Sequence, residues 1–141
     1  MPSEDAPKQP HRATREEALV RDGPVIAIVD DDESFREALE RFLRTFAFRV
    51  RSFASGEEFL QSTELRFVSC LLLDLAMPGM NGLEVKRELT ARGVRIPTVF
   101  VTAHTGDVEQ DLVTADAIAI LRKPVDQQML LRLVRSAAGE R

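Results

Sequence analysis

Two short apolar segments of this chain each run directly into acidic residues. The segment Val25–Val29 is followed by three aspartates at positions 30–32, and the segment Leu71–Leu73 is followed by Asp74. Apolar segments of this length are typical of strands buried on both faces of a parallel sheet. If the two strands belong to one such sheet, their carboxylates meet at one edge, where like charges repel each other unless a cation neutralises them. A hard divalent cation meets that need, because it prefers oxygen ligands.

The size and composition of the chain indicate one soluble globular domain. Its 141 residues are 44% hydrophobic and 30% charged, which is ordinary for such a domain, and its single cysteine, Cys70, is interpreted as a small buried hydrophobe. The net charge of −4 argues against a nucleic-acid-binding surface, which is normally basic. The apolar segments are far shorter than the ~20 residues of a membrane helix, and the polar N-terminus does not resemble a secretory signal. We therefore expect a cytoplasmic protein that binds neither nucleic acid nor membrane directly.

The chain divides into a polar tail and one folded domain. Residues 1–22 are rich in Pro, Glu and Lys and are predicted to be disordered, whereas residues 23–141 form the domain. Apolar runs predict five strands, at about Val25–Val29, Phe48–Phe53, Val68–Leu73, Thr98–Thr102 and Ile118–Leu121. Helical spacing and capping signals predict five helices, at about Glu33–Phe46, Ser55–Ser62, Gly82–Ala91, Val108–Thr114 and Asp126–Ala138. The apolar face of the first helix consists of Phe35, Leu39, Phe42, Leu43 and Phe46.

This alternation predicts an α/β domain with a doubly wound, five-stranded parallel sheet and helices on both faces. Right-handed crossovers favour the flavodoxin-like strand order 2-1-3-4-5, which has a switch point between the first and third strands. Ligands bind beyond the carboxyl ends of the strands at such a point. Asp30, Asp31 and Asp74 follow those two strands, so the fold argument and the charge argument indicate the same edge.

Two further polar side chains are expected at this edge. Thr102 ends the fourth predicted strand, and Lys123 follows the fifth and precedes Pro124. A carboxylate beside a bound Mg²⁺ can attack phosphorus and form an acyl phosphate, because the cation offsets the negative charge of both partners. An ammonium group and a hydroxyl group can contact the remaining phosphoryl oxygens. The set of side chains therefore predicts phosphoryl transfer.

The chain resembles the receiver domain of a two-component response regulator, from about residue 24 to residue 138. Each matching motif is weak alone, but their order and spacing together are specific. The motifs are Val-Asp-Asp-Asp-Glu-Ser-Phe-Arg at 29–36, Leu-Asp-Leu-Ala-Met-Pro-Gly-Met-Asn-Gly-Leu-Glu at 73–84, Val-Thr-Ala at 101–103 and Arg-Lys-Pro at 122–124.

The resemblance implies a phosphoacceptor and a metal site. Asp74 would accept a phosphoryl group from a histidine kinase or a phosphotransfer protein. Asp30 and Asp31 would organise Mg²⁺ (or Mn²⁺), with Asp31 as a direct ligand, and the backbone carbonyl of Ala76 would be a further ligand beside Asp74. Asp32 lies outside the matching acidic pair and has no assigned role. Acidic residues at these positions also suit the N-cap region of the following helix.

The resemblance also implies how the phosphoryl group is held and sensed. The phosphoryl group would be contacted by Thr102, Ala103 and Lys123. Thr102 would also supply the switch hydroxyl, and the small Ala103 would leave phosphorus open to a donor or to water. The peptide bond between Lys123 and Pro124 is often cis in this family. Such a domain catalyses only its own phosphorylation and dephosphorylation, and it then switches its conformation or its binding to a downstream protein.

The chain departs from the family pattern on one face. The family usually has Tyr or Phe three residues before the lysine of the fifth strand, and this chain has Ile120 at that switch position. In the family, this ring moves inward when the threonine turns toward the phosphoryl group. An aliphatic isoleucine cannot repeat that movement of a large ring. Asp116 replaces a usual glycine, and the predicted helix over residues 108–114 is short and poor in apolar residues. We therefore expect partner contacts to depend more on the helices over residues 33–46 or 126–138.

Two other functions stay open at this point. In an aspartate-nucleophile phosphohydrolase, Asp30 and Asp32 would be the nucleophile and the acid, although no cap domain is evident. In a pseudo-receiver, the domain would be a scaffold that is never phosphorylated. Replacement of Asp74 separates a receiver from a phosphohydrolase, because only the receiver would lose its nucleophile. No effector domain follows the last predicted helix, so the chain is expected to be either a stand-alone receiver or a piece of a longer regulator.

Overall fold

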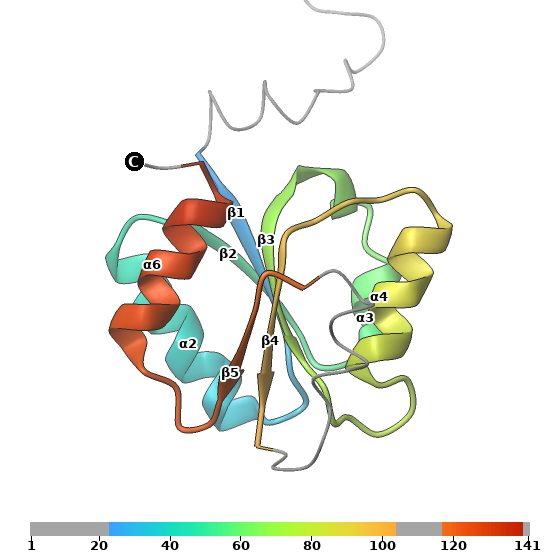
Figure 1. The fold of residues 1–141 in the computed structure, drawn as a ribbon, viewed down its shortest axis with the longest axis horizontal. Coiled ribbons are helices and arrows are strands. Elements are labelled where there is room, and N and C mark those ends of the chain that lie inside the picture. The colour runs from blue at the N-terminus through green and yellow to red at the C-terminus, as the bar shows by residue number, and fades with distance from the viewer. Residues whose placement is uncertain (1–22, 104–116, 140–141) are drawn as a thin grey trace, which may run out of the picture.

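The computed structural model describes residues 23–103 and 117–139 of the chain. The predicted tail over residues 1–22 and the predicted helix over residues 108–114 lie outside the described residues, as does Asp116. Within the described part, five parallel strands form one sheet in the order β2-β1-β3-β4-β5 (Figure 1). The predicted α/β, flavodoxin-like fold class is confirmed.

The strand predictions are correct to within about one residue, as expected when a pattern marks an element better than its ends. The observed strands are β1 (Val25–Val29), β2 (Arg49–Phe53), β3 (Val68–Asp74), β4 (Thr98–Thr102) and β5 (Ala119–Arg122). Two of the small differences matter for function. Asp74 belongs to β3 rather than following it, and its backbone pairs with Val101 of β4. β5 ends at Arg122, directly before Lys123.

Helices cover both faces of the sheet. They are α2 (Glu33–Thr45), α3 (Gly56–Leu60), α4 (Gly82–Ala91) and α6 (Gln127–Ala137), with a 3₁₀ turn, η1 (Leu65–Phe67), before β3 that the sequence patterns did not predict. α2 and α6 lie on one face and α3 and α4 on the other (Figure 1). Of the helices in the described ranges, none has the length and apolar character needed to cross a bilayer.

The sheet separates two apolar clusters. Successive side chains of a strand point to opposite faces, so Leu73 joins the cluster beneath α3 and α4, whereas Leu72 joins the cluster beneath α2 and α6. The helices complete the two clusters with Phe59, Leu60, Val85 and Leu89 on the first side and Leu39, Leu43, Leu130 and Val134 on the second. β1 and β3 are buried on both faces, and apart from Ser69 and Asp74 their residues are apolar. The acidic residues at their carboxyl ends therefore mark the sheet edge.

Side-chain caps fix where the helices begin. Asp32 Oδ1 accepts a hydrogen bond from the Phe35 amide at 3.1 Å, which gives the unassigned third aspartate a structural role. Asp126 accepts from the Met129 amide at 3.0 Å, so α6 begins one residue later than predicted. Helical spacing overestimates burial at the end of α2, where Phe46 is 37% exposed.

The thiol of Cys70 should be inert in the folded protein. Its side chain is fully buried in β3, and burial raises the pKa of the thiol to about 12. Because the thiolate is the reactive species, we expect no reaction with Ellman's reagent at pH 8 in native buffer and complete reaction in denaturing guanidinium chloride. Rapid reaction in native buffer would contradict the buried position of β3.

Candidate functional site

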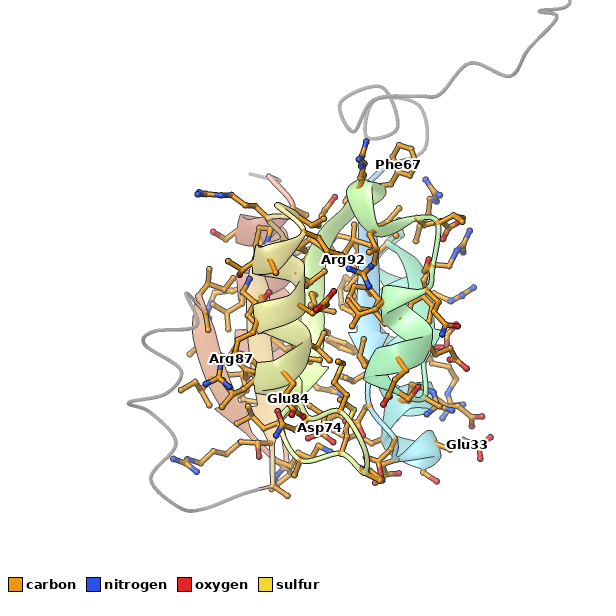
Figure 2. All side chains as sticks on the ribbon, turned by 90° about the vertical axis from the view of Figure 1, so that its right-hand side faces the viewer. Glu33, Phe67, Asp74, Glu84, Arg87 and Arg92 are labelled. Carbon is orange, nitrogen blue, oxygen red and sulfur yellow. The ribbon has the colours of Figure 1, made fainter. Side chains whose placement is uncertain are left out.

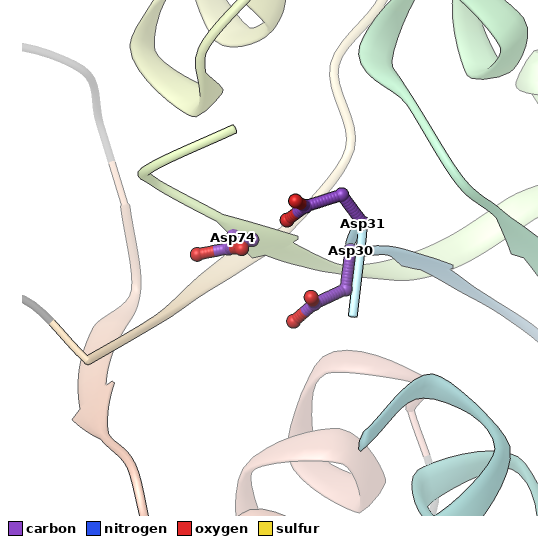
Figure 3. A group of neighbouring side chains, drawn as sticks. All are labelled: Asp30, Asp31 and Asp74. Atoms are coloured by element: carbon purple, nitrogen blue, oxygen red, sulfur yellow. The ribbon is translucent and has the colours of Figure 1, made fainter. Parts of the chain in front are cut away.

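The candidate site lies at the carboxyl ends of β1 and β3, the two neighbouring strands at the switch point. Asp30 and Asp31 follow β1 and Asp74 closes β3, and Figure 3 shows the side chains of Asp30 and Asp31 directed to the side on which Asp74 lies. One carboxylate oxygen from each lies within 4.8 Å of the others. In Figure 2, Asp74 and Glu33 lie at one end of the molecule and Phe67 lies at the opposite end. The expected convergence of the three carboxylates is therefore observed.

The two buried carboxylates of the cluster are each anchored by a backbone amide. Asp30 is 2% exposed and Asp74 is 5% exposed, whereas Asp31 is exposed. Asp30 Oδ1 accepts from the Asp32 amide at 2.9 Å, and Asp74 Oδ1 accepts from the Ala76 amide at 3.3 Å. These bonds hold both side chains in place, although their charges repel each other.

Lys123 balances part of this negative charge. Its Nζ lies 3.0 Å from Asp30 Oδ2 and 3.9 Å from Asp74 Oδ2. Its amide donates to the Thr102 carbonyl at 2.8 Å, which ties the lysine to the end of β4. The peptide bond between Lys123 and Pro124 is cis, as the resemblance implied. Lys123 lies within ion-pair distance of two of the three clustered carboxylates, so it balances only part of their negative charge.

The electrostatics of the site raise the pKa of Asp74 from 3.8 to about 7. Burial is the main cause, and the neighbouring charge of Asp30 adds to it, with a smaller contribution from Asp31. Lys123 and the Ala76 amide act in the opposite direction. Three carboxylate oxygens at this spacing are the ligands that Mg²⁺ prefers, and a divalent cation would offset the repulsion that the lysine leaves.

The other predicted site residues lie around this cluster. Thr102 is fully buried at the end of β4, one residue beyond the partner of Asp74 in the strand register, and Ala103 follows it with its side chain exposed. Ala76 is also exposed, at the start of the loop after β3. Ile120 lies farther back in β5, pairs with Phe100 and packs half-buried against the cluster beneath α3 and α4.

Comparison with known proteins agrees with this geometry. The family profile described as response regulator receiver domain matches residues 26–135. The chain belongs to this family. It is therefore a response regulator receiver domain of a two-component system.

Individual relatives support the family assignment, and the curated ones are about twice as long as the segment they share with this chain. Response regulator protein TmoT of Ectopseudomonas mendocina is 39% identical over 115 residues, which cover 80% of this chain and 52% of TmoT. The solved receiver protein from Burkholderia phymatum is 37% identical, with a TM-score of 0.73, over 84% of this chain and 97% of that one. Chemotaxis protein CheY4 of Vibrio cholerae shares the fold, with a TM-score of 0.74 at 23% identity over 81% of this chain and 98% of CheY4. This receiver spans about half the length of the curated relatives it matches.

Two contacts at the receiver's site were not predicted from its sequence. The Phe35 ring lies beneath the Lys123 ammonium, with 4.2 Å between Nζ and the ring centroid, and the Arg36 guanidinium donates to the Asp30 carbonyl at 2.7 Å. Both residues lie in the matching motif at 29–36, but the spacing of Phe35 is explained by an apolar helix face. No sequence signal distinguishes a ring that packs in the core from one that meets a lysine.

Gly82 lets the start of α4 approach the end of β3. Its amide donates to the Leu75 carbonyl at 3.0 Å, and a Cβ at this position would lie 2.3 Å from the Asp74 carbonyl oxygen. Backbone atoms cannot move aside as a side chain can. The absence of a side chain at position 82 is therefore a condition for the position of Asp74.

Gly82→Ala should displace the backbone around Asp74 and destabilise the fold by about 1–3 kcal/mol, the usual cost of overpacking. Gly56→Ala is a matched control, because the Cβ it adds meets the Val85 side chain in the contact between α3 and α4 instead. Urea unfolding should show a loss of stability in both variants. The amide resonances of residues 74–76 should move in Gly82→Ala alone, and equal movement in both would contradict the assigned role.

Asp74→Asn should stabilise the metal-free receiver, and more so at higher pH. The pKa of Asp74 is raised on folding, so the folded state holds the proton more tightly and wild-type stability falls as pH rises from about 4 through about 7. We expect the variant's advantage to be small at pH 4 and on the order of a few kcal/mol at pH 8. Thermal and urea unfolding across this range, without divalent metal, measure it.

Asp32→Asn is the control for this experiment, because asparagine also caps helices and position 32 lies outside the carboxylate cluster. It should not reproduce the gain in stability that Asp74→Asn shows at pH 8. A gain for Asp74→Asn that does not change with pH would show that charge repulsion is not its source.

Proposed function

We propose that this receiver accepts a phosphoryl group on Asp74 from a histidine kinase or a phosphotransfer protein. The observation that carries the proposal is the convergence of three carboxylates, with one oxygen of each within 4.8 Å of the others, and the Lys123 ammonium 3.0 Å from Asp30 Oδ2. The proposed ligands of Mg²⁺ (or Mn²⁺) are Asp30, Asp31, Asp74 and the Ala76 backbone carbonyl. When bound, the cation supplies positive charge that makes the phosphoryl oxygens and the nucleophile compatible.

The chain's own residues then perform the transfer. A carboxylate oxygen of Asp74 attacks phosphorus, an acyl phosphate bond forms, and the bond from phosphorus to the donor breaks as the donor leaves with its electron pair. Lys123 contacts the phosphoryl oxygens, and the Thr102 hydroxyl donates a hydrogen bond to one of them. The exposed, small Ala103 leaves room for the donor, and later for the water that hydrolyses the acyl phosphate.

The response to phosphorylation is a change of conformation or of partner. In this proposal Thr102 moves toward the phosphoryl group, and Ile120 is the second switch position. The domain comprises residues 23–141, turns over no external substrate, works in the cytoplasm and passes the signal to a downstream protein through α2 or α6. Nucleic acid and membrane are not direct partners of this chain in the proposal.

The geometry disfavours the alternative functions. A phosphohydrolase that used Asp30 and Asp32 would need the second carboxyl group as its acid, but Asp32 caps α2 through the Phe35 amide. A scaffold that is never phosphorylated would have no use for buried, mutually repelling carboxylates, which cost stability.

Incubation with acetyl phosphate and Mg²⁺, followed by intact mass measurement, tests the proposal. The wild type and Asp32→Asn should each gain one phosphoryl unit, and Asp74→Asn should gain none. Chelation of the divalent metal with EDTA should abolish the gain, because the carboxylates alone repel the phosphoryl group. Labelling that persists in Asp74→Asn would support a phosphohydrolase nucleophile at Asp30 instead.

A phosphate analogue tests the scaffold alternative independently of the donor. Beryllofluoride with Mg²⁺ should shift the amide resonances around Thr102 in the wild type. Unchanged resonances, together with no gain in mass, would favour the scaffold.

A further inference from the structure

The Phe35 ring is an unassigned part of the phosphoryl site. It lies in the first turn of α2, half-buried against the apolar cluster beneath α2 and α6. Its ring centroid is 4.2 Å from Lys123 Nζ, well inside the ~6 Å range of a cation–π contact. The Lys123 side chain is only 18% exposed. The ring therefore takes a place beside the ammonium group that water would otherwise fill.

The ring and Asp30 hold the lysine in different ways. Asp30 binds it with a charge at 3.0 Å, but a metal ion bound at the site would compete with the lysine for that charge. The negative face of an aromatic ring attracts an ammonium group, yet it is a poor ligand for a hard divalent cation. Phe35 therefore attracts the Lys123 ammonium whether or not a metal ion is bound to the carboxylates.

The segment that carries Phe35 is fixed to the carboxylates themselves. The Phe35 amide donates to the Asp32 cap, the Asp32 amide donates to Asp30 Oδ1 at 2.9 Å, and Arg36 donates to the Asp30 carbonyl at 2.7 Å. These bonds fix the position of the Phe35 ring relative to Asp30. A ring on such a frame can define where the ammonium group lies before a phosphoryl group arrives.

We propose that Phe35 is a positioning residue that holds the Lys123 ammonium by a cation–π contact, ready for the phosphoryl group, with or without the metal. The role rests on the proposed phosphorylation of Asp74. Loss of a partly desolvated cation–π contact corresponds to a rate change between about twofold and about thirtyfold. We expect phosphorylation to slow by a factor in this range when the aromatic face is lost.

Phe35→Leu, with Phe42→Leu as its matched control, tests the proposal. Phe42 is a half-buried ring of the same helix that packs on the same cluster, but its ring partner is Phe46 at 5.2 Å. Two quantities are measured, namely the rate of phosphorylation by acetyl phosphate with Mg²⁺ and the side-chain NMR signals of Lys123 in metal-free protein. Phe35→Leu should slow phosphorylation and remove the upfield ring-current shift of the Lys123 ε-protons, and Phe42→Leu should do neither.

Fluorinated phenylalanines at position 35 separate attraction from packing. They keep the shape of the ring and progressively weaken its negative face, so the phosphorylation rate should fall in steps from phenylalanine to the pentafluoro derivative. This series also decides the question if Phe35→Leu does not fold. In a Lys123→Ala background the same series should have no effect, because the ammonium group is gone.

Several results would overturn the proposal. They are a wild-type rate in Phe35→Leu, equal losses in Phe35→Leu and Phe42→Leu, and a rate that is insensitive to fluorination. If the wild type itself takes up no phosphoryl group, the proposed function fails, and the Lys123 signals then decide the contact alone. Loss of their upfield shift in Phe35→Leu would support the cation–π contact, and an unchanged shift would refute it.

Discussion

The close approach of like charges at one edge of the sheet is the constraint on which the rest of the structure depends. Asp30 and Asp74 are nearly inaccessible to water, and each has an oxygen fixed by a backbone amide. They extend from β1 and β3, which are buried on both faces, so the strand ends cannot separate without opening both apolar clusters. The repulsion is therefore held in the fold, where a proton, Lys123 or a cation can relieve it. Because the carboxylates repel each other, the free energy of the folded state changes with any change in the charge of the site.

Much of the fold and the acidic part of the site could be predicted from the sequence, because both follow from local patterns. Short apolar runs identified all five strands, and strand order followed from the handedness of crossovers. Once the order is known, the positions of Asp30, Asp31 and Asp74 follow, since the carboxyl ends of neighbouring parallel strands meet. The exact ends of the elements could not be predicted, because caps such as Asp126 depend on a hydrogen bond that a pattern only suggests.

The remaining parts of the site depend on contacts between segments far apart in the sequence. Phe35 has the spacing of a core residue, and only the folded chain brings Lys123 above its ring. Gly82 is explained locally as the start of a helix, and only the folded chain shows that a side chain there would collide with the Asp74 carbonyl. In both cases the local interpretation is correct but incomplete, because one residue serves packing and the site together. Sequence patterns report the first role and are silent about the second.

The segment from Asp30 to the first turn of α2 contributes more contacts to the site than β5 does. One short segment supplies the paired carboxylates, the Asp32 cap, the Phe35 ring and the Arg36 bond to the Asp30 carbonyl. A change of charge at the site acts on that segment directly, through the hydrogen bond of 2.9 Å that the Asp32 amide donates to Asp30 Oδ1. β5 is coupled through Lys123, but Ile120 packs against the opposite cluster and has no ring whose rotation could exchange a buried for an exposed position. For the proposed function, this geometry favours relay through α2.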